Sequence, residues 1–168
     1  RSREIEKVAK EYNFKKYFNL EIPTTRIDLI PISSIVKMLT EIYNVVKPEI
    51  IYVPFYQDVH TDHQVISKAI RSTLKWFRHP YLKKVLMYET LSETEFNFES
   101  TNIFHPNVFV DISDFIDNKI ETMKFYNSEM GEFPFPRSEK TIKSLAAIRG
   151  SQSGYNAAEA FELVYERL

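Results

Sequence analysis

The sequence has no cysteine and only 3 glycines among its 168 residues. The lack of cysteine excludes disulfides, thiolate nucleophiles and cysteine-ligated zinc, so a metal would have to be held by His, Asp or Glu. None of the glycines stands in a G-x-G-x-x-G or G-x-x-x-x-G-K pattern, which excludes a glycine loop that cradles a nucleotide. No apolar run approaches the roughly 20 residues that cross a bilayer, and the charged first residues do not resemble a signal peptide. We therefore expect a cytoplasmic protein without a membrane span.

Charge is nearly balanced, with 22 basic and 23 acidic side chains and a formal net charge of -1. No basic stretch offers the electrostatic footprint that nucleic acids require, so no nucleic-acid partner is expected. The length fits one domain over residues 1–168, and no repeat or linker divides it. The composition leaves the oligomeric state open, a homo-oligomer included.

Hydrophobic periodicity predicts helices and strands that alternate through the first ninety residues, which favours an α/β fold with a mainly parallel sheet flanked by helices. The run 49–55 is apolar throughout, which is typical of an interior strand with helices on both faces. The predicted helices are 4–12, a helix from Ser33 or Ser34 as N-cap to 46, 63–77, 115–126 and 141–148, and the predicted strands are 16–21, 49–55, 83–88 and 108–112. Two prolines make residues 133–137 extended.

The densest polar cluster follows the apolar strand and contains Asp58, His60, Asp62 and His63. Ligands of open α/β sheets bind beyond the carboxyl ends of the strands, so this loop stands where a site is expected. Two imidazoles with carboxylates beside them can bind a divalent metal or supply an acid and a base. We expect the two rings to lie near each other.

Simpler interpretations stay open for the same residues. Asp62 could serve only as the N-cap of the following helix, and two histidines in a surface loop are commonly inert. The cluster is also an incomplete metal shell, because catalytic zinc usually takes three protein ligands.

Outside this cluster the polar residues carry weaker signals. His79 and His105 each precede a proline and are interpreted as turn residues. Arg78 and Arg137 could bind an anionic or hydroxylated substrate, or could pair with surface carboxylates. The carboxylates of residues 89–95 are expected in a solvated loop, and the abundant aromatic residues in the core.

The pattern Asp58-x-His60-x-Asp62-His63 after a Lys-Pro and an apolar strand resembles the second conserved block of the PIG-L/LmbE-like N-deacetylases. Three further segments are similar to parts of the same family. They are Arg1-x-x-Glu4 with the helix that follows, residues 107–129, and residues 136–161. The resemblance therefore extends over nearly the whole chain.

This resemblance implies a Rossmann-like fold and a hydrolase that uses zinc or another divalent ion to remove the acetyl group from an N-acetylated amino sugar. Carried over, His63 is a metal ligand, and His60 stabilises the oxyanion or protonates the leaving amine. Asp62 is the companion carboxylate of the catalytic block, and Arg1 matches a position that binds substrate in some members. Asp58 is also expected on the substrate side of the cluster.

The family's His-Pro-Asp-Asp block is absent, since the two His-Pro pairs are followed by Tyr81 and Asn107. We therefore expect the first strand-helix unit, two metal ligands and the general base to be missing, which predicts an unpaired strand edge or exposed apolar surface. The isolated chain is expected to be inactive and to bind zinc weakly. The alternative is a catalytically inactive binding module that retains the fold. A metal phosphoesterase is disfavoured, because two-metal sites need more carboxylates than this loop offers.

Overall fold

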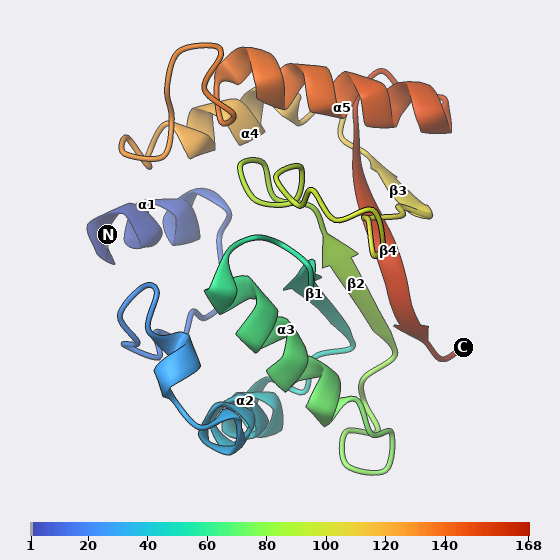
Figure 1. Cartoon of the computed structure of the whole chain (residues 1–168). Coiled ribbons are helices and arrows are strands. Elements are labelled where there is room, and N and C mark those ends of the chain that lie inside the picture. Colours follow the sequence, from blue (N-terminus) through green and yellow to red (C-terminus); the bar gives the residue numbers. More distant parts are fainter. Residues whose placement is uncertain (1) are drawn as a thin grey trace. The chain divides into compact units, whose positions relative to one another are not determined.

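The computed structural model of the chain describes residues 2–168. These residues fall into two compact units, one made of the chain up to Asn19 together with Phe109–Ala160, the other of Leu20–Val108 and Phe161–Leu168. The elements in chain order (Figure 1) are α1 Ser2–Glu11, the 3-10 helix η1 Ile27–Leu29, α2 Ile32–Val46, β1 Ile50–Pro54, α3 Thr61–Thr73, β2 Lys84–Tyr88, β3 Val108–Asp111, α4 Ile116–Met123, α5 Glu139–Ser153 and β4 Ala158–Glu166.

The four strands form one sheet in the order β1-β2-β4-β3. β1 and β2 are parallel, with Ile50 opposite Lys84 and Pro54 opposite Tyr88. β2 and β4 are antiparallel, with Lys84 opposite Glu166. The fold is therefore α/β as predicted, but its sheet is mixed, and the expectation of a mainly parallel sheet is not confirmed.

β1 lies at an edge of this sheet, so the prediction that it is an interior strand is wrong. Its side chains alternate, because Val53 is buried whereas Ile50 and Tyr52 are 48% and 52% exposed. One face of β1 is therefore covered by the core. The side chains on its other face are apolar but exposed. Among residues 2–168, no strand pairs with the outer edge of β1. Every open sheet has two such edges, so the loss of a first strand-helix unit stays a prediction.

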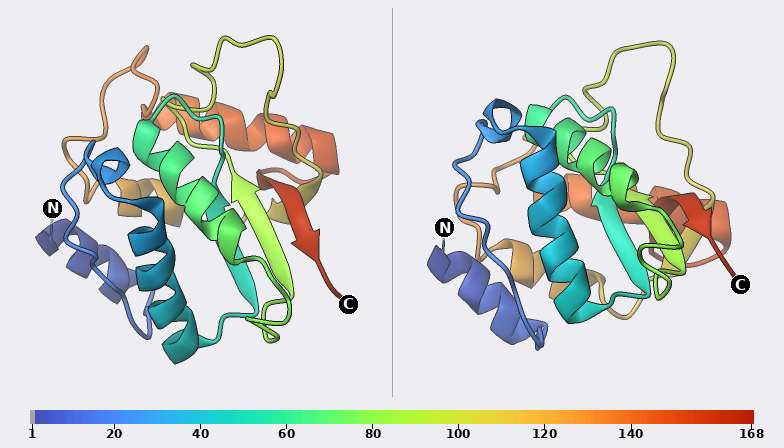
Figure 2. Two further views of the ribbon diagram at one scale, coloured as in Figure 1. Left: turned by 60° about the horizontal axis from the view of Figure 1, so that its bottom comes forward. Right: turned by 90° about the horizontal axis from the view of Figure 1, so that it is seen from below.

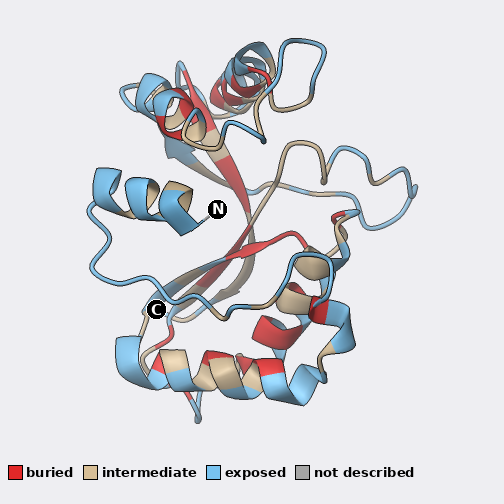
Figure 3. Cartoon of the chain, turned by 90° about the vertical axis from the view of Figure 1, so that its left-hand side faces the viewer, coloured by how far each residue is buried: buried red, intermediate tan, exposed pale blue. Residues whose placement is uncertain are grey.

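α2 and α3 lie side by side on one face of β1 and β2 (Figure 2). Figure 3 shows buried residues on the strands and on the helix faces turned toward them, with exposed residues on the outer faces. The apolar stripe of α2 was predicted from its spacing, and it supplies the buried side chains of Ile35, Leu39 and Tyr43. α2 begins earlier than predicted, with Pro31 rather than Ser33 or Ser34 at the N-cap position.

Several other elements differ from the sequence patterns. Residues 133–137 form turns rather than the expected extended segment, since the Phe135 amide donates to the Glu132 carbonyl and the Ser138 amide to the Phe135 carbonyl. The predicted strand 16–21 does not form, and Glu21 has a φ of 54°, which breaks extended geometry. α3 ends at Thr73, four residues before the predicted end. β4 was not predicted, because three glutamates interrupt its apolar residues. One of these charges is paired within the sheet, since Lys84 Nζ lies 2.5 Å from Glu166 Oε1.

No helix within the described residues combines the length and the apolar character that a bilayer span requires.

Within the other unit, α5 begins at an N-cap that sequence rules favour and ends at a left-handed glycine. Ser138 Oγ accepts a hydrogen bond from the Thr141 amide at 3.2 Å, and Gly154 at the C-cap has a φ of 82°. Gly150 has a different role, because a Cβ placed there would stand 2.6 Å from the Tyr155 carbonyl oxygen and 3.0 Å from the Ala157 nitrogen. The chain that leaves α5 therefore passes directly against the helix at Gly150.

Gly150→Ala is expected to lower the free energy of unfolding by about 1 to 3 kcal/mol, the usual cost of overpacking. Helix propensity alone predicts the opposite, a gain of about 1 kcal/mol, but the atoms that the methyl group meets belong to the backbone and cannot rotate away. Urea unfolding followed by circular dichroism measures the change, with the exposed Ser144→Ala as the control on the same helix. A stabilised Gly150→Ala protein would contradict the close approach.

Candidate functional site

The polar cluster lies where β1 ends and α3 begins. The amide of Phe55 donates to the Tyr88 carbonyl at 3.1 Å, so the carboxyl ends of β1 and β2 are adjacent. The chain then turns through Asp58, whose amide donates to the Phe55 carbonyl at 3.2 Å, and enters α3 at Thr61. The cluster thus stands beyond the carboxyl ends of two parallel strands, as the pattern of strand and polar loop predicts.

Asp58 is the centre of the cluster and is completely buried. Its Oδ2 lies 2.7 Å from Nδ1 of His63, and its Oδ1 accepts a hydrogen bond from Thr94 Oγ1 at 2.6 Å. Both carboxylate oxygens are therefore engaged inside the protein. This burial favours a role in orienting His63 over the expected contact with substrate.

The negative charge of Asp58 also acts on a second buried group. Burial, and to a smaller extent the charge of Asp58, raise the pKa of Tyr88 above its ordinary value. Tyr88 therefore stays a neutral phenol beside the carboxylate.

The contact with Asp58 determines which ring nitrogen of His63 is available. An ionised carboxylate can only accept hydrogen bonds, so Nδ1 of His63 carries the proton that points to Asp58. In the neutral ring, Nε2 then has its lone pair free. The side chain of His63 is 25% exposed, so this nitrogen belongs to a ring that solvent reaches.

His60 has the opposite arrangement. It is the N-cap residue of α3, and its Nδ1 accepts a hydrogen bond from the Asp62 amide at 3.1 Å. A backbone N–H can only donate, so Nδ1 of His60 is unprotonated and the neutral ring carries its proton on Nε2. The rings of His60 and His63 are stacked, with centroids 5.0 Å apart and planes 19° from parallel. As expected, the two imidazoles are adjacent, and one offers a lone pair where the other offers a proton.

Asp62 uses its carboxylate to hold a distant part of the chain. Its Oδ2 accepts from the Thr25 amide at 2.8 Å, and its Oδ1 accepts from the Ile27 amide at 3.4 Å. The simple interpretation of Asp62 as the N-cap is wrong, because His60 occupies that position. Asp62 instead joins the first turn of α3 to the segment that enters η1.

The expected substrate-binding arginines are not brought together by the described structure. Arg1 lies outside the described residues. Arg78 is exposed and follows α3, at the amino ends of β1 and β2 and thus at the opposite end of these strands from His60. Arg137 belongs to the other compact unit, where its Nη2 lies 2.9 Å from Glu129 Oε2 and its Nε donates to the Glu129 carbonyl.

The remaining histidines lie away from the cluster. His79 lies in a turn as predicted, since its carbonyl accepts from the Leu82 amide at 3.0 Å. Its side chain is buried, with Nδ1 2.9 Å from the Tyr81 hydroxyl and its ring edge against Tyr43. Burial, with a smaller contribution from Arg78, lowers the pKa of His79, which suits a neutral core residue. The amide of His105 donates to Glu162 Oε2 at 3.3 Å.

Sequence reasoning missed Thr94 and Gln64. Thr94 lies in the segment that was predicted to be a solvated carboxylate loop, and Gln64 Nε2 donates to the Asp58 carbonyl at 2.8 Å. The contact from Thr94 joins residues 36 apart, and no spacing rule indicates it.

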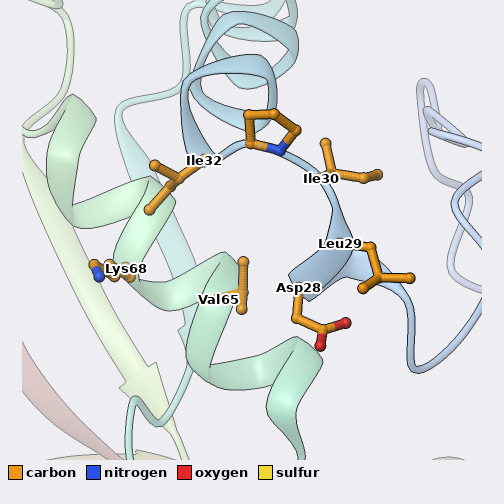
Figure 4. A pocket seen from close by; sticks show the side chains of 7 residues that line it. Asp28, Leu29, Ile30, Ile32, Val65 and Lys68 are labelled. Atoms are coloured by element: carbon orange, nitrogen blue, oxygen red, sulfur yellow. The ribbon is translucent and has the colours of Figure 1, made fainter.

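A shallow open pocket of about 420 Å³ lies in the compact unit that contains α2 and α3 (Figure 4). It is lined by the η1 to α2 segment and by Val65 and Lys68 of α3. None of its lining residues belongs to the cluster of residues 58–63, and we assign it no part in the chemistry of the histidines.

The fit of a metal to this site is partial. A histidine that donates its second ring N–H to a buried carboxylate is the usual arrangement of a metal-binding imidazole, and His63 has it. Within residues 2–168, however, no three His, Asp or Glu side chains gather as a metal-binding group. The described residues therefore do not form a complete zinc site.

Residues 1–74 match the model of the PIG-L family, described as GlcNAc-PI de-N-acetylase, which confirms the resemblance over these residues. Solved structures share the fold at low identity. A conserved protein from Thermus thermophilus is 19% identical with a TM-score of 0.73, over 99% of this chain and 74% of that chain. An N,N'-diacetylchitobiose deacetylase from Pyrococcus horikoshii, solved with an inhibitor, is 18% identical with a TM-score of 0.68, over 98% and 62%. A 4-carboxy-2-hydroxymuconate hydratase from Pseudomonas putida is 16% identical with a TM-score of 0.63, over 99% and 72%.

Asp62→Ala is expected to release the backbone at Thr25 and Ile27 and to lower the free energy of unfolding by about 1.5 to 3 kcal/mol, the usual worth of hydrogen bonds to a charged group. Amide hydrogen exchange at these two residues and urea unfolding measure both effects. The exposed Asp28→Ala is the matched control and should change stability by less than about 0.5 kcal/mol. Unchanged exchange at Thr25 in Asp62→Ala would show that the carboxylate does not hold this segment.

Proposed function

We propose that this chain, whose residues 1–74 match the PIG-L family model, takes part in hydrolysis of the N-acetyl group of an N-acetylated amino sugar or its conjugate. The observation that carries the proposal is the pair of stacked imidazoles, whose hydrogen-bond partners require opposite tautomers. The deacetylase among the structures of the same fold supports it at the level of the fold.

Amide hydrolysis requires an acceptor for the proton of the attacking water and a donor for the oxygen or nitrogen on which charge or a proton accumulates. In this proposal the Nε2 lone pair of His63 would hold the metal ion, and the hydrogen bond to Asp58 orients the ring. The acceptor for the water proton would come from the His-Pro-Asp-Asp block, because one lone pair cannot bind a metal and a proton. The Nε2–H of His60 donates a hydrogen bond to the oxyanion, since a neutral ring that released this proton to the leaving amine would become an imidazolate. Asp62 positions His60 through its backbone amide and keeps the surrounding segment in place.

Zinc dependence, or dependence on another divalent ion, is part of the proposal, with the Nε2 lone pair of His63 as the one ligand that this loop offers. Since the described residues contain no complete metal-binding group, the proposal requires further ligands from elsewhere. The family's His-Pro-Asp-Asp block would be their source. A cytoplasmic location stays a prediction, and the oligomeric state stays open.

A catalytically inactive binding module is the second candidate, and the lack of a complete metal-binding group among residues 2–168 favours it. The hydratase of the same fold adds that this architecture is compatible with a different reaction. The reading frame upstream of Arg1 separates the first two candidates. A His-Pro-Asp-Asp block there supports the enzyme, and its absence from the complete gene supports the binding module.

The 168-residue chain is expected to show no tight, stoichiometric zinc site, because one His ligand does not replace three. Isothermal titration with zinc, repeated with a competing chelator, measures this. His63→Ala is the control for any weak binding that remains. Stoichiometric binding that survives the chelator would show that this chain alone completes the site.

His63→Ala and His60→Ala should separate in the complete gene product. We expect His63→Ala to abolish zinc binding and acetate release from N-acetylglucosamine-type substrates. His60→Ala should retain the metal and lower kcat by roughly 100- to 1000-fold, the usual effect of deleting one oxyanion donor. Metal analysis and acetate release are measured on the same samples. Equal metal loss in both variants would make His60 a ligand as well, and unchanged deacetylation in His63→Ala would refute the deacetylase assignment of this loop.

A further inference from the structure

We propose that Thr94 is a positioning residue that holds the buried Asp58 carboxylate in the orientation in which Oδ2 accepts from Nδ1 of His63; this inference deepens the proposed function and rests on it for its catalytic meaning. Thr94 does not face a substrate in this proposal. It lies 36 residues from Asp58 in the chain, in the loop that follows β2, and its hydroxyl reaches the buried carboxylate at 2.6 Å.

The direction of the hydrogen bonds follows from one backbone amide. The Thr90 N–H points to Thr94 Oγ1 at 2.7 Å. An amide N–H can only donate, so the Thr94 oxygen is the acceptor in this contact. The single hydroxyl proton of Thr94 is then directed to Oδ1 of Asp58, which accepts it.

The same order of donors and acceptors extends to the imidazole of His63. Asp58 accepts from Thr94 on Oδ1 and, as a carboxylate, accepts from Nδ1 of His63 on Oδ2. The sequence of contacts from the Thr90 amide to His63 therefore has one consistent orientation, and it leaves the lone pair on Nε2. In the opposite tautomer of His63, the lone pair of Nδ1 would face Oδ2 of Asp58, and two acceptors would be in contact inside the protein.

Burial makes this arrangement sensitive to the hydroxyl. Asp58 has no exposed surface, so water cannot replace a donor that is removed. The Thr90 amide donates to the Thr94 hydroxyl, but two backbone contacts of this segment do not involve it. The Thr94 amide donates to the Thr90 carbonyl at 2.9 Å, and the Val59 amide donates to the Glu93 carbonyl at 3.4 Å. A substitution that removes only the hydroxyl therefore tests the orientation of Asp58 and His63 without detaching the loop.

The experiment is nitrogen-15 NMR of the histidine rings at pH about 8, where an ordinary imidazole is neutral, with a chelator present to keep His63 free of metal. Thr94→Val removes the hydroxyl at nearly constant volume, and Thr94→Ser retains it as the matched control. We expect wild type and Thr94→Ser to carry the His63 proton on Nδ1. In Thr94→Val the carboxylate still accepts from Nδ1–H, so the tautomer stays the same, but a second donor no longer fixes the carboxylate. The His63 Nδ1 proton should therefore exchange with water roughly tenfold or more faster, as loss of a hydrogen bond to a charged group predicts.

The ring of His60 serves as the internal reference, because its Nδ1 accepts from the Asp62 amide in all three proteins. A purely structural role for Thr94 would change stability and leave the exchange rate of the His63 Nδ1 proton unchanged. If Thr94→Val does not fold, wild type alone still decides, because a His63 proton on Nε2 overturns the proposal and a proton on Nδ1 together with a slowly exchanging Thr94 hydroxyl supports it. An equal exchange rate of the His63 Nδ1 proton in folded Thr94→Val and Thr94→Ser also overturns it. The readout needs no substrate and no metal, so its failure is distinct from a failure to find deacetylation.

Discussion

The hydrogen bond between the buried carboxylate of Asp58 and Nδ1 of His63 is the contact on which the rest of the site depends. A carboxylate without exposed surface has to be satisfied entirely by protein donors. His63 and Thr94 provide them, one from α3 and one from the loop after β2. The carboxylate thereby links the segment that follows β1 to the loop that follows β2. The same two hydrogen bonds orient His63 and hold these two segments together.

The sequence predicted the parts of the fold that depend on local pattern. The apolar spacing indicated α2, and the strands β1, β2 and β3 fall within a residue or two of their predicted bounds. It failed where partners far along the chain decide the outcome. β4 needs strand neighbours to accommodate its glutamates, and β1 is an edge strand although its composition is that of a buried one. The apolar content of a strand reports its propensity to pair, whereas its place in the sheet depends on which other strands exist.

The same division applies to the candidate site. The proximity of His60 and His63 was predictable, because a short loop after a strand constrains both to one end of the sheet. The separate roles of Asp58 and Asp62 were not, since each carboxylate is engaged by residues distant in sequence. Asp58 contacts Thr94, and Asp62 contacts the amides of Thr25 and Ile27. The residue types of the loop indicated the chemistry, whereas its arrangement depends on contacts between residues 35 to 37 positions apart.

The use of a histidine as the N-cap of α3 links proton transfer to the start of a helix. Nδ1 of His60 holds either the Asp62 N–H or a proton of its own, because one lone pair cannot serve both. A doubly protonated His60 would have to give up its cap and leave the first turn of α3 one acceptor short. A neutral His60 that released its Nε2 proton would become an imidazolate. The start of the helix therefore favours His60 as a hydrogen-bond donor through Nε2–H and disfavours transfer of the proton itself.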